Sequence, residues 1–226
     1  MLVNGIRLVP DPSGALWWPA TRTLIVADLH FEKGSAYASR RFGPMLPPYD
    51  TRVTLGNLQR LLRAYAPRRL VCLGDSFHDA GGPGRLADDD AAKLRQLASQ
   101  TEWLWIYGNH DPRLPDWMPG RQAVKLSEAG LIFRHQPGAT PIPGEVVGHF
   151  HPKASLEVRG KRLTRRCFVT DGDRIVMPAF GAYTGGLDVA DPALFGQFKR
   201  GFHAWMLGDG AVFPIGSRRL LLRTAR

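Results

Sequence analysis

The polar stretch Gly108-Asn109-His110-Asp111 ends a nearly continuous apolar run at residues 103–107. Two earlier apolar runs, at 23–27 and 70–73, end just as abruptly in polar residues. Apolar runs of this length are typical of strands covered on both faces. Ligand sites of open α/β sheets lie outside the carboxyl ends of the strands, so we expect these polar segments to line one crevice.

The segments between the apolar runs have the pattern of helices, one at 50–65 and one at about 89–99. Asp50 or Thr51 can cap the first of them. Alternation of strand and helix predicts a parallel sheet. The residues that we expect on one side of the first helix are Val53, Leu58, Leu61, Leu62 and Tyr65.

The rest of the chain has a different character. A β-hairpin is expected near the start, with strands at 5–9 and 15–18 and its turn at 11–14. Short strands with turns between them are expected at 131–134, 145–147, 156–158, 167–169, 174–177 and 204–207. The chain should therefore form one α/β domain over residues 1–226, with two packed sheets inside and helices outside.

Charge and composition limit the function. The 226 residues include 30 Lys and Arg and 20 Asp and Glu, which gives a formal net charge of +10. Such a surplus favours polyanionic partners such as DNA, although a generally basic proteome is the alternative explanation. Cys72 and Cys167 are too few for a disulfide framework. The chain shows neither a secretory signal nor an apolar stretch of about eighteen residues, so we expect a cytoplasmic protein with no membrane partner.

Metal-competent side chains follow the apolar runs. Each motif alone is weak, since Asp-x-His and Gly-Asp are also common turn chemistry. Together they predict a centre for two metal ions, because a carboxylate can bridge two divalent cations. Mixed oxygen and imidazole ligands suit Mn²⁺, Fe or Zn²⁺ better than Ca²⁺. The candidate metal ligands are Asp28, His30, Asp75, Asn109, His135, His149 and His151.

These motifs resemble the calcineurin-like metallophosphoesterase superfamily, whose signature D-x-H, G-D, G-N-H-[DE], H and G-H-x-H is present in order. The resemblance implies a four-layer α/β/β/α sandwich of two mixed β-sheets flanked by helices, the metallo-dependent phosphatase fold. It also implies that Asp75 bridges the two metals. Asp28, His30 and His151 would then complete one metal site. The other would be completed by Asn109, His135 and His149.

A narrower resemblance, to the bacterial ligase-associated DNA-damage-response phosphoesterases, rests on the stretches 28–34, 46–52, 73–79 and 178–186. It implies a Mn²⁺-dependent phosphodiesterase or endonuclease acting on DNA in bacterial DNA repair, with a DNA ligase and a helicase as possible partners. The alternatives are a phosphodiesterase or phosphomonoesterase acting on a small molecule such as a nucleotide, and a non-catalytic scaffold. A homodimer is a weaker expectation, because dimers are the commonest assembly of soluble proteins.

The expected mechanism starts with a hydroxide that bridges the metals and attacks phosphorus in line. His110 is the candidate general acid. Asp111 is a second candidate catalytic residue that orients His110, or else it only ties down the loop. His78 and Asn109 are candidate substrate contacts, with a plain loop histidine as the alternative for His78. Arg40, Arg41 and Arg113 could meet nucleic-acid phosphates, and the 178–186 loop could shape the crevice or a dimer contact.

Overall fold

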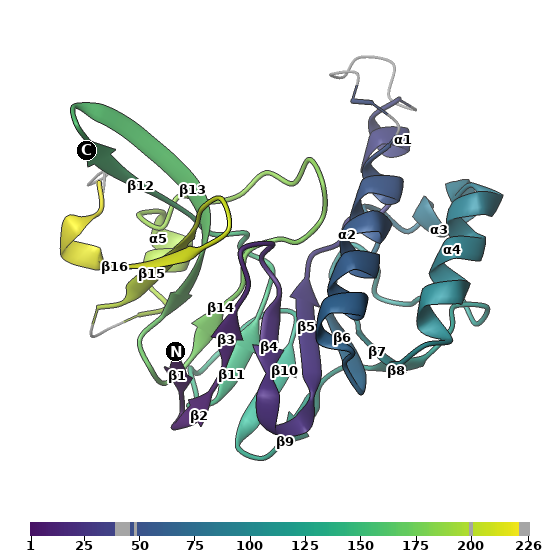
Figure 1. The fold of residues 1–226 in the computed structure, drawn as a ribbon, viewed down its shortest axis with the longest axis horizontal. Coiled ribbons are helices and arrows are strands. Elements are labelled where there is room, and N and C mark those ends of the chain that lie inside the picture. The colour runs from purple at the N-terminus through teal and green to yellow at the C-terminus, as the bar shows by residue number, and fades with distance from the viewer. Residues whose placement is uncertain (39–45, 48, 199–200, 222–226) are drawn as a thin grey trace.

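The computed structural model describes residues 1–38, 46–47, 49–198 and 201–221. Its first sheet contains the three apolar runs as neighbouring parallel strands, with a hairpin added at one edge (Figure 1). Of the hairpin's expected first strand at 5–9, residue 9 belongs to it, whereas residues 6–7 pair with residues 2–3 instead. In spatial order its strands are β3 (Val9–Pro10), β4 (Leu16–Trp18), β5 (Thr23–Ala27), β6 (Arg69–Leu73), β7 (Glu102–Ile106) and β8 (Arg121–Ala123).

The second sheet comes from the later part of the chain and is mixed. Strands β10, β11 and β14 run parallel, and the remaining pairs are antiparallel. Its spatial order is β16 (Val212–Gly216), β15 (His203–Leu207), β13 (Lys161–Thr170), β14 (Ile175–Val176), β11 (Glu145–Val147), β10 (Leu131–Arg134) and β9 (Leu126–Glu128), while β12 (Lys153–Val158) pairs with β13. A small separate pair joins β1 (Leu2–Val3) to β2 (Ile6–Arg7).

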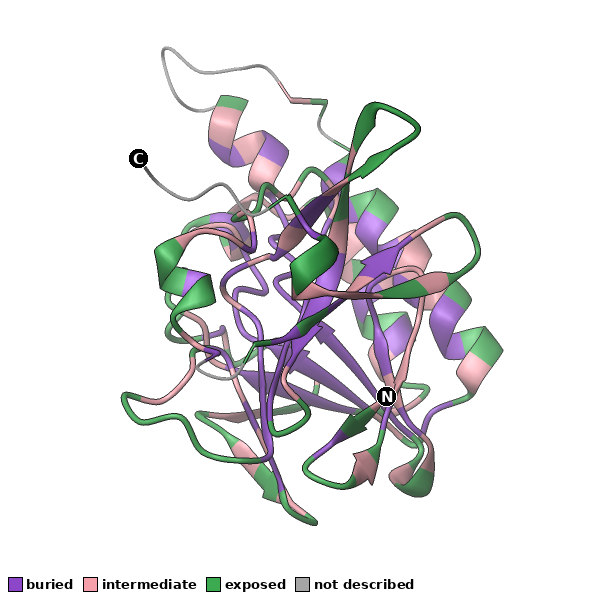
Figure 2. Cartoon of the chain, turned by 90° about the vertical axis from the view of Figure 1, so that its left-hand side faces the viewer, coloured by how far each residue is buried: buried purple, intermediate pink, exposed green. Residues whose placement is uncertain are grey.

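Three apolar clusters hold the layers together, because successive side chains of a strand point to opposite faces. Leu24 and Leu70 pack with the helices, whereas Ile25 and Val71 pack between the two sheets against Phe133. Figure 2 shows the strands largely buried and the outer surfaces of the helices exposed. The helices on the outer face of the first sheet are α1 (Lys33–Ala38), α2 (Asp50–Tyr65), α3 (Gly82–Arg85) and α4 (Asp88–Ala98).

The outer face of the second sheet has a thinner cover. In the described part of the chain, its α-helical cover is α5 (Pro192–Phe195), assisted by Phe198 and Phe202. Two 3-10 turns, η1 (Pro19–Thr21) and η2 (Ser217–Arg219), complete the elements. The predicted four-layer α/β/β/α sandwich is therefore confirmed, with an outermost layer that consists mostly of loop.

The start of α2 corrects one expectation. Neither Asp50 nor Thr51 caps the helix, whose N-cap is Tyr49 without a side-chain hydrogen bond. Both side chains are buried and bind residues 32–33 at the start of α1 instead: Asp50 accepts from the Lys33 backbone N–H at 2.8 Å, and Thr51 accepts from that of Glu32. Val53 is 45% exposed and does not belong to the buried face.

Both cysteines are buried free thiols. Burial raises the pKa of each thiol well above its usual value, which keeps them protonated and unreactive. Within the described residues, no helix has the length and apolar character needed to cross a membrane.

Candidate metal centre

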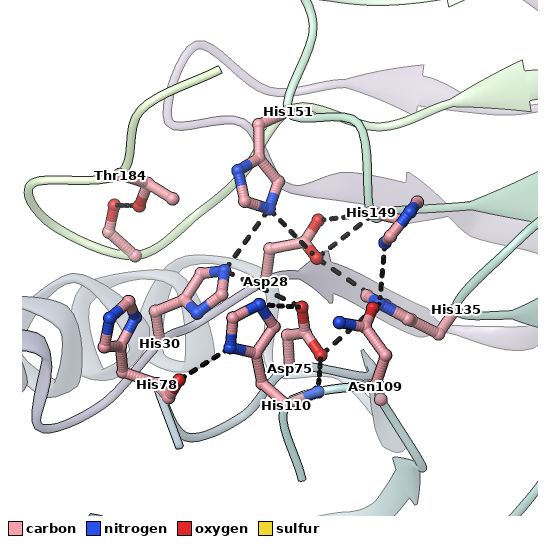
Figure 3. A network of polar contacts seen from close by, with 12 residues as sticks. Asp28, His30, Asp75, His78, Asn109, His110, His135, His149, His151 and Thr184 are labelled. Atoms are coloured by element: carbon pink, nitrogen blue, oxygen red, sulfur yellow. Dashed lines mark hydrogen bonds and ion pairs between the residues drawn. The ribbon is translucent and has the colours of Figure 1, made fainter. Parts of the chain in front are cut away.

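The candidate ligands come from the carboxyl ends of five strands. Asp28 and His30 follow β5, Asp75 follows β6, and Asn109 and His110 follow β7. From the second sheet, His135 follows β10, and His149 and His151 follow β11. Parallel strands present their carboxyl ends at one edge, and the two sheets bring these edges together (Figure 3). The structure thus gathers all seven candidate ligands in one place.

One group consists of Asp28, His30, Asp75 and His151, whose ligand atoms all lie within 4.8 Å of one another. The Nε2 atoms of His30 and His151 are 3.3 Å apart. Nε2 of His151 also lies 3.3 Å from an oxygen of Asp28. Two imidazole nitrogens and two carboxylates therefore converge on one point.

A second group consists of Asp75, His135 and His149, again within 4.8 Å. Oδ1 of Asp75 lies 3.4 Å from Nε2 of His135, while its Oδ2 lies 3.9 Å from Nε2 of His30. Asn109 joins this group through its Oδ1 atom, 2.8 Å from the same His135 nitrogen. The two oxygens of Asp75 thus face different groups, as a bridging carboxylate requires.

The donor set fits two divalent cations. Nδ1 of His135 donates to the Leu73 carbonyl at 3.0 Å, which directs Nε2 into the site. Burial alone would lower the pKa of His135, but its hydrogen bond to Asp75 and the charges of Asp28 and Asp75 raise it, so a bound metal ion would take the place of the Nε2 proton. Nε2 of His135 lies 2.8 Å from Oδ1 of Asn109 and 3.3 Å from Nδ1 of His149. A divalent metal ion in each group would be bound by these oxygen and nitrogen atoms.

The protonation states agree with this fit. Burial, with a further contribution from His151, lowers the pKa of His30 to about 2, so its ring is neutral and able to bind metal. Burial alone would raise the pKa of Asp75. The hydrogen bond and charge of His135 and the backbone N–H of His110 more than reverse this, so the pKa is lowered and the carboxylate stays ionised.

The backbone of the site is strained. Five of the candidate ligands have left-handed φ angles: Asp28 at 55°, His30 at 46°, Asp75 at 46°, His149 at 71° and His151 at 48°. A non-glycine residue in this region costs roughly 1–2 kcal/mol. Such residues gather at functional sites, where the surrounding fold holds them in place.

Two motif glycines make room for the ligands. A Cβ atom on Gly108 would lie 2.1 Å from the backbone nitrogen of Asp75. A Cβ atom on Gly148 would lie 2.6 Å from Oδ2 of Asp28. The sequence shows these glycines within the motifs. Which ligand each glycine makes room for depends on contacts between segments that are distant in sequence.

The 178–186 loop lies against the ligand segments. The backbone N–H groups of Phe180 and Gly181 donate to the carbonyls of Ala27 and Asp28 at 2.8 and 3.1 Å. Ala182 N–H donates to Oγ1 of Thr54 in α2. The loop therefore shapes the crevice, which was one of the two expected roles; a dimer contact stays a prediction.

His110 and Asp111 have different surroundings. His110 is 41% exposed, and its Nδ1 donates to the His78 carbonyl at 2.7 Å, so Nε2 is directed toward Asp75, 3.9 Å away. Asp111 is buried and accepts the backbone N–H groups of Phe77 and Gly108 at 3.0 and 3.2 Å. These contacts favour the loop-tethering alternative for Asp111 over a role in orienting the His110 ring.

His78 lies at the edge of the site. Its ring stacks on that of His110, with centroids 5.6 Å apart, and ring nitrogens of His30, His78 and His110 form a third group within 4.8 Å. A substrate contact by His78 is compatible with this position and stays a prediction. Arg113 is exposed, whereas Arg40 and Arg41 lie outside the described residues.

Fold and site together define a metal-dependent hydrolase of phosphoric esters. The sequence of residues 21–175 matches the model of the calcineurin-like phosphoesterase family. The chain belongs to this family, as the signature motifs predicted, and the non-catalytic alternative is set aside.

Solved structures give a closer comparison. The nuclease MPE of Pseudomonas putida shares 27% identity with a TM-score of 0.71, over 95% of this chain and 98% of that one. YfcE, a phosphoesterase from E. coli, shares 14% identity with a TM-score of 0.42, over 86% of this chain and 98% of that one. The TM-score of the YfcE match is too low to support a conclusion about fold or function. A search of curated protein sequences found no match.

Proposed function

We propose that this protein is a Mn²⁺-dependent phosphodiesterase that acts as an endonuclease on DNA. One observation carries the proposal: two groups of metal-competent side chains share the carboxylate of Asp75. Paired metal sites of this kind are used by phosphatases and nucleases to hold both the attacking and the leaving oxygen of a displacement at phosphorus.

Mixed carboxylate, amide and imidazole donors support Mn²⁺, while Fe and Zn²⁺ fit the same donors. When bound, the metal ions would activate water and offset the negative charge of the phosphate. One ion would be held by Asp28, His30, Asp75 and His151, and the other by Asp75, Asn109, His135 and His149.

DNA as substrate is supported by the likeness to the P. putida nuclease, which spans almost the whole of both chains. The net charge of +10 agrees with a polyanionic substrate. A role in DNA repair, the association with a DNA ligase and a helicase, a homodimer and a cytoplasmic location were expected from the sequence and stay predictions.

His110 acts as the general acid in this proposal. Its backbone N–H donates to Oδ1 of Asp75 at 3.0 Å, and its Nδ1–H is fixed on the His78 carbonyl. The protonated Nε2 is left to donate to the oxygen that departs from phosphorus. Asp111 supports this geometry by accepting hydrogen bonds from the backbone N–H groups of Phe77 and Gly108, which hold the loop that follows β7.

The test compares three substrates with the metal-loaded enzyme. Mn²⁺-stimulated hydrolysis should be faster on bis-p-nitrophenyl phosphate than on p-nitrophenyl phosphate, and circular single-stranded DNA should be cleaved. Asp75→Asn should abolish all three activities. A preference for the monoester, with circular DNA left intact, would favour a small-molecule phosphatase instead.

A further inference from the structure

Positive charge is concentrated in one hairpin. The basic hairpin, residues 153–170, consists of β12, the turn Arg159-Gly160 and β13. It holds six basic residues and one acidic residue, a net charge of +5, which is half of the chain's +10. The basic residues are Lys153, Arg159, Lys161, Arg162, Arg165 and Arg166.

The basic hairpin starts at the metal centre. Lys153, the first residue of β12, follows the candidate ligand His151 by two residues. Six residue pairs connect the strands, from Lys153 opposite Arg166 to Val158 opposite Lys161. At 3.3 Å per residue this ribbon is about 20 Å long. Figure 1 shows it extending beyond the other strands of the second sheet.

The base of the hairpin is fixed beside the site. Arg166 donates to the Ala179 carbonyl at 2.6 Å, in the loop that covers Asp28. Lys153, Arg165 and Arg166 line a groove of about 370 Å³, in which Asp209 is the one acidic lining residue. Positive charge therefore begins next to the metal centre. Along the hairpin it is divided between two faces, with Lys153, Arg162 and Arg166 on one face and Lys161 and Arg165 on the other.

Most of this charge has no carboxylate partner. Across the part of the chain that the structure describes, the one basic-hairpin residue in an ion pair with a carboxylate is Arg162, 3.6 Å from Asp188. Arg159, Lys161 and Arg165 are exposed. Lys153 and Arg166 lie directly opposite each other, and like charges in that position destabilise a sheet. Their concentration here is thus better explained by a polyanion that they bind than by the stability of the fold.

Resting on the proposed function, we infer that the basic hairpin binds the sugar-phosphate backbone of the DNA strand as it leaves the metal centre. With the 3.4 Å rise of a strand in B-form DNA, a length of about 20 Å would span at most roughly six phosphates, and an extended single strand would place fewer along it. Arginine and lysine contacts to phosphates position the strand without reading its sequence. Cleavage should accordingly depend on DNA length and salt more than on sequence.

The test removes three charges from the hairpin and, in a matched control, three from the opposite layer. The hairpin variant is Arg159→Gln/Lys161→Gln/Arg165→Gln. The control variant is Arg60→Gln/Arg63→Gln/Arg95→Gln, which changes exposed arginines of α2 and α4. DNA binding is titrated from 50 to 200 mM salt with Ca²⁺ in place of Mn²⁺, and kcat/KM is measured for DNA and for bis-p-nitrophenyl phosphate.

The hairpin variant should bind single-stranded DNA at least tenfold more weakly. The slope of log Kd against log salt should fall by about 2, because each lost phosphate contact removes about 0.7 from it. Its ratio of kcat/KM for DNA to kcat/KM for bis-p-nitrophenyl phosphate should fall at least tenfold. The control variant should change the ratio less than threefold.

Equal losses in the two triple variants, or an unchanged ratio in the hairpin variant, would overturn the inference and leave the proposed function intact. A wild-type enzyme that hydrolyses the small diester but neither binds nor cleaves DNA would contradict both the inference and the proposed function. Thermal melting checks that each variant folds. If the triple variant does not melt cooperatively, Arg159→Gln/Lys161→Gln at the tip repeats the test, with at least a threefold loss expected.

Discussion

His110 is held from two directions, through its backbone N–H on Asp75 and through its ring on the His78 carbonyl. Replacement of a general acid typically costs a factor of about 10²–10⁴ in rate. We therefore expect His110→Asn to lower kcat for the diester by that amount while two metal ions remain bound, as measured by elemental analysis. His203→Asn, which changes an exposed histidine of β15, is the control. Unchanged turnover in His110→Asn would exclude His110 from the chemistry.

Gly148 offers a test of the packing around the ligands. An alanine Cβ would lie 2.6 Å from Oδ2 of Asp28 and 3.0 Å from Cβ of Ala27, so the carboxylate must move. Displacement of a catalytic group by about 1 Å can cost on the order of 10²-fold in rate. We expect Gly148→Ala to lower kcat/KM for the diester by at least tenfold. Gly84→Ala, where a Cβ meets nothing within 4 Å, should stay within twofold of wild type; equal activities would contradict the proposed clearance.

At the scale of the elements, the start of α2 is fixed to the segment that carries the first ligands. Oγ1 of Thr51 donates to the Glu32 carboxylate at 2.8 Å and accepts the Glu32 backbone N–H at 2.9 Å, with both residues buried. Loss of a hydrogen bond to a buried charged group costs about 1–3 kcal/mol. Thr51→Ala should lower the free energy of unfolding by that amount in urea titrations. Thr51→Ser keeps the hydroxyl and should recover most of it; an alanine variant as stable as wild type would show that the contact is not stabilising.

The elements themselves were predictable where the pattern was strong. The helix expected at 50–65 has those bounds, and the apolar runs form β5, β6 and β7. Strands β8, β9 and β16 were missed because they are short or poor in buried apolar residues. The bonding of Asp50 and Thr51 was also missed, since a side chain able to cap a helix can equally bind a distant backbone group, and only the fold decides.

The sequence was enough to predict which residues form the metal centre. Motifs after buried strands must share one edge of a parallel sheet, so Asp28, Asp75 and Asn109 could be placed together before the structure was known. The hydrogen bond that Asp111 accepts from the Phe77 N–H could not be predicted, because the two residues lie 34 positions apart in sequence. The basic hairpin was not predicted either, because its charges become a surface only when β12 pairs with β13.

At the scale of the whole molecule, metal binding should stabilise the fold. The site buries two aspartates beside four imidazoles, and a ligand present at 100 times its Kd adds about 2.7 kcal/mol to stability. For a chain of this size, each kcal/mol shifts Tm by roughly 2–4 °C. We expect Mn²⁺ to raise Tm by about 5–10 °C over the chelator-treated protein in differential scanning fluorimetry. Asp75→Asn should lose most of this rise, and identical Tm values with Mn²⁺ and with chelator would contradict a resident metal.

The left-handed backbone of the ligands has an evolutionary consequence. Glycine at position 151 could adopt the φ of 48° without the penalty of roughly 1 kcal/mol that His151 carries. Where selection for hydrolysis is relaxed, drift should therefore replace such positions early, because each loss of a ligand relieves strain in the scaffold. A descendant that had turned from catalyst into scaffold would be recognisable by glycine or asparagine at these places.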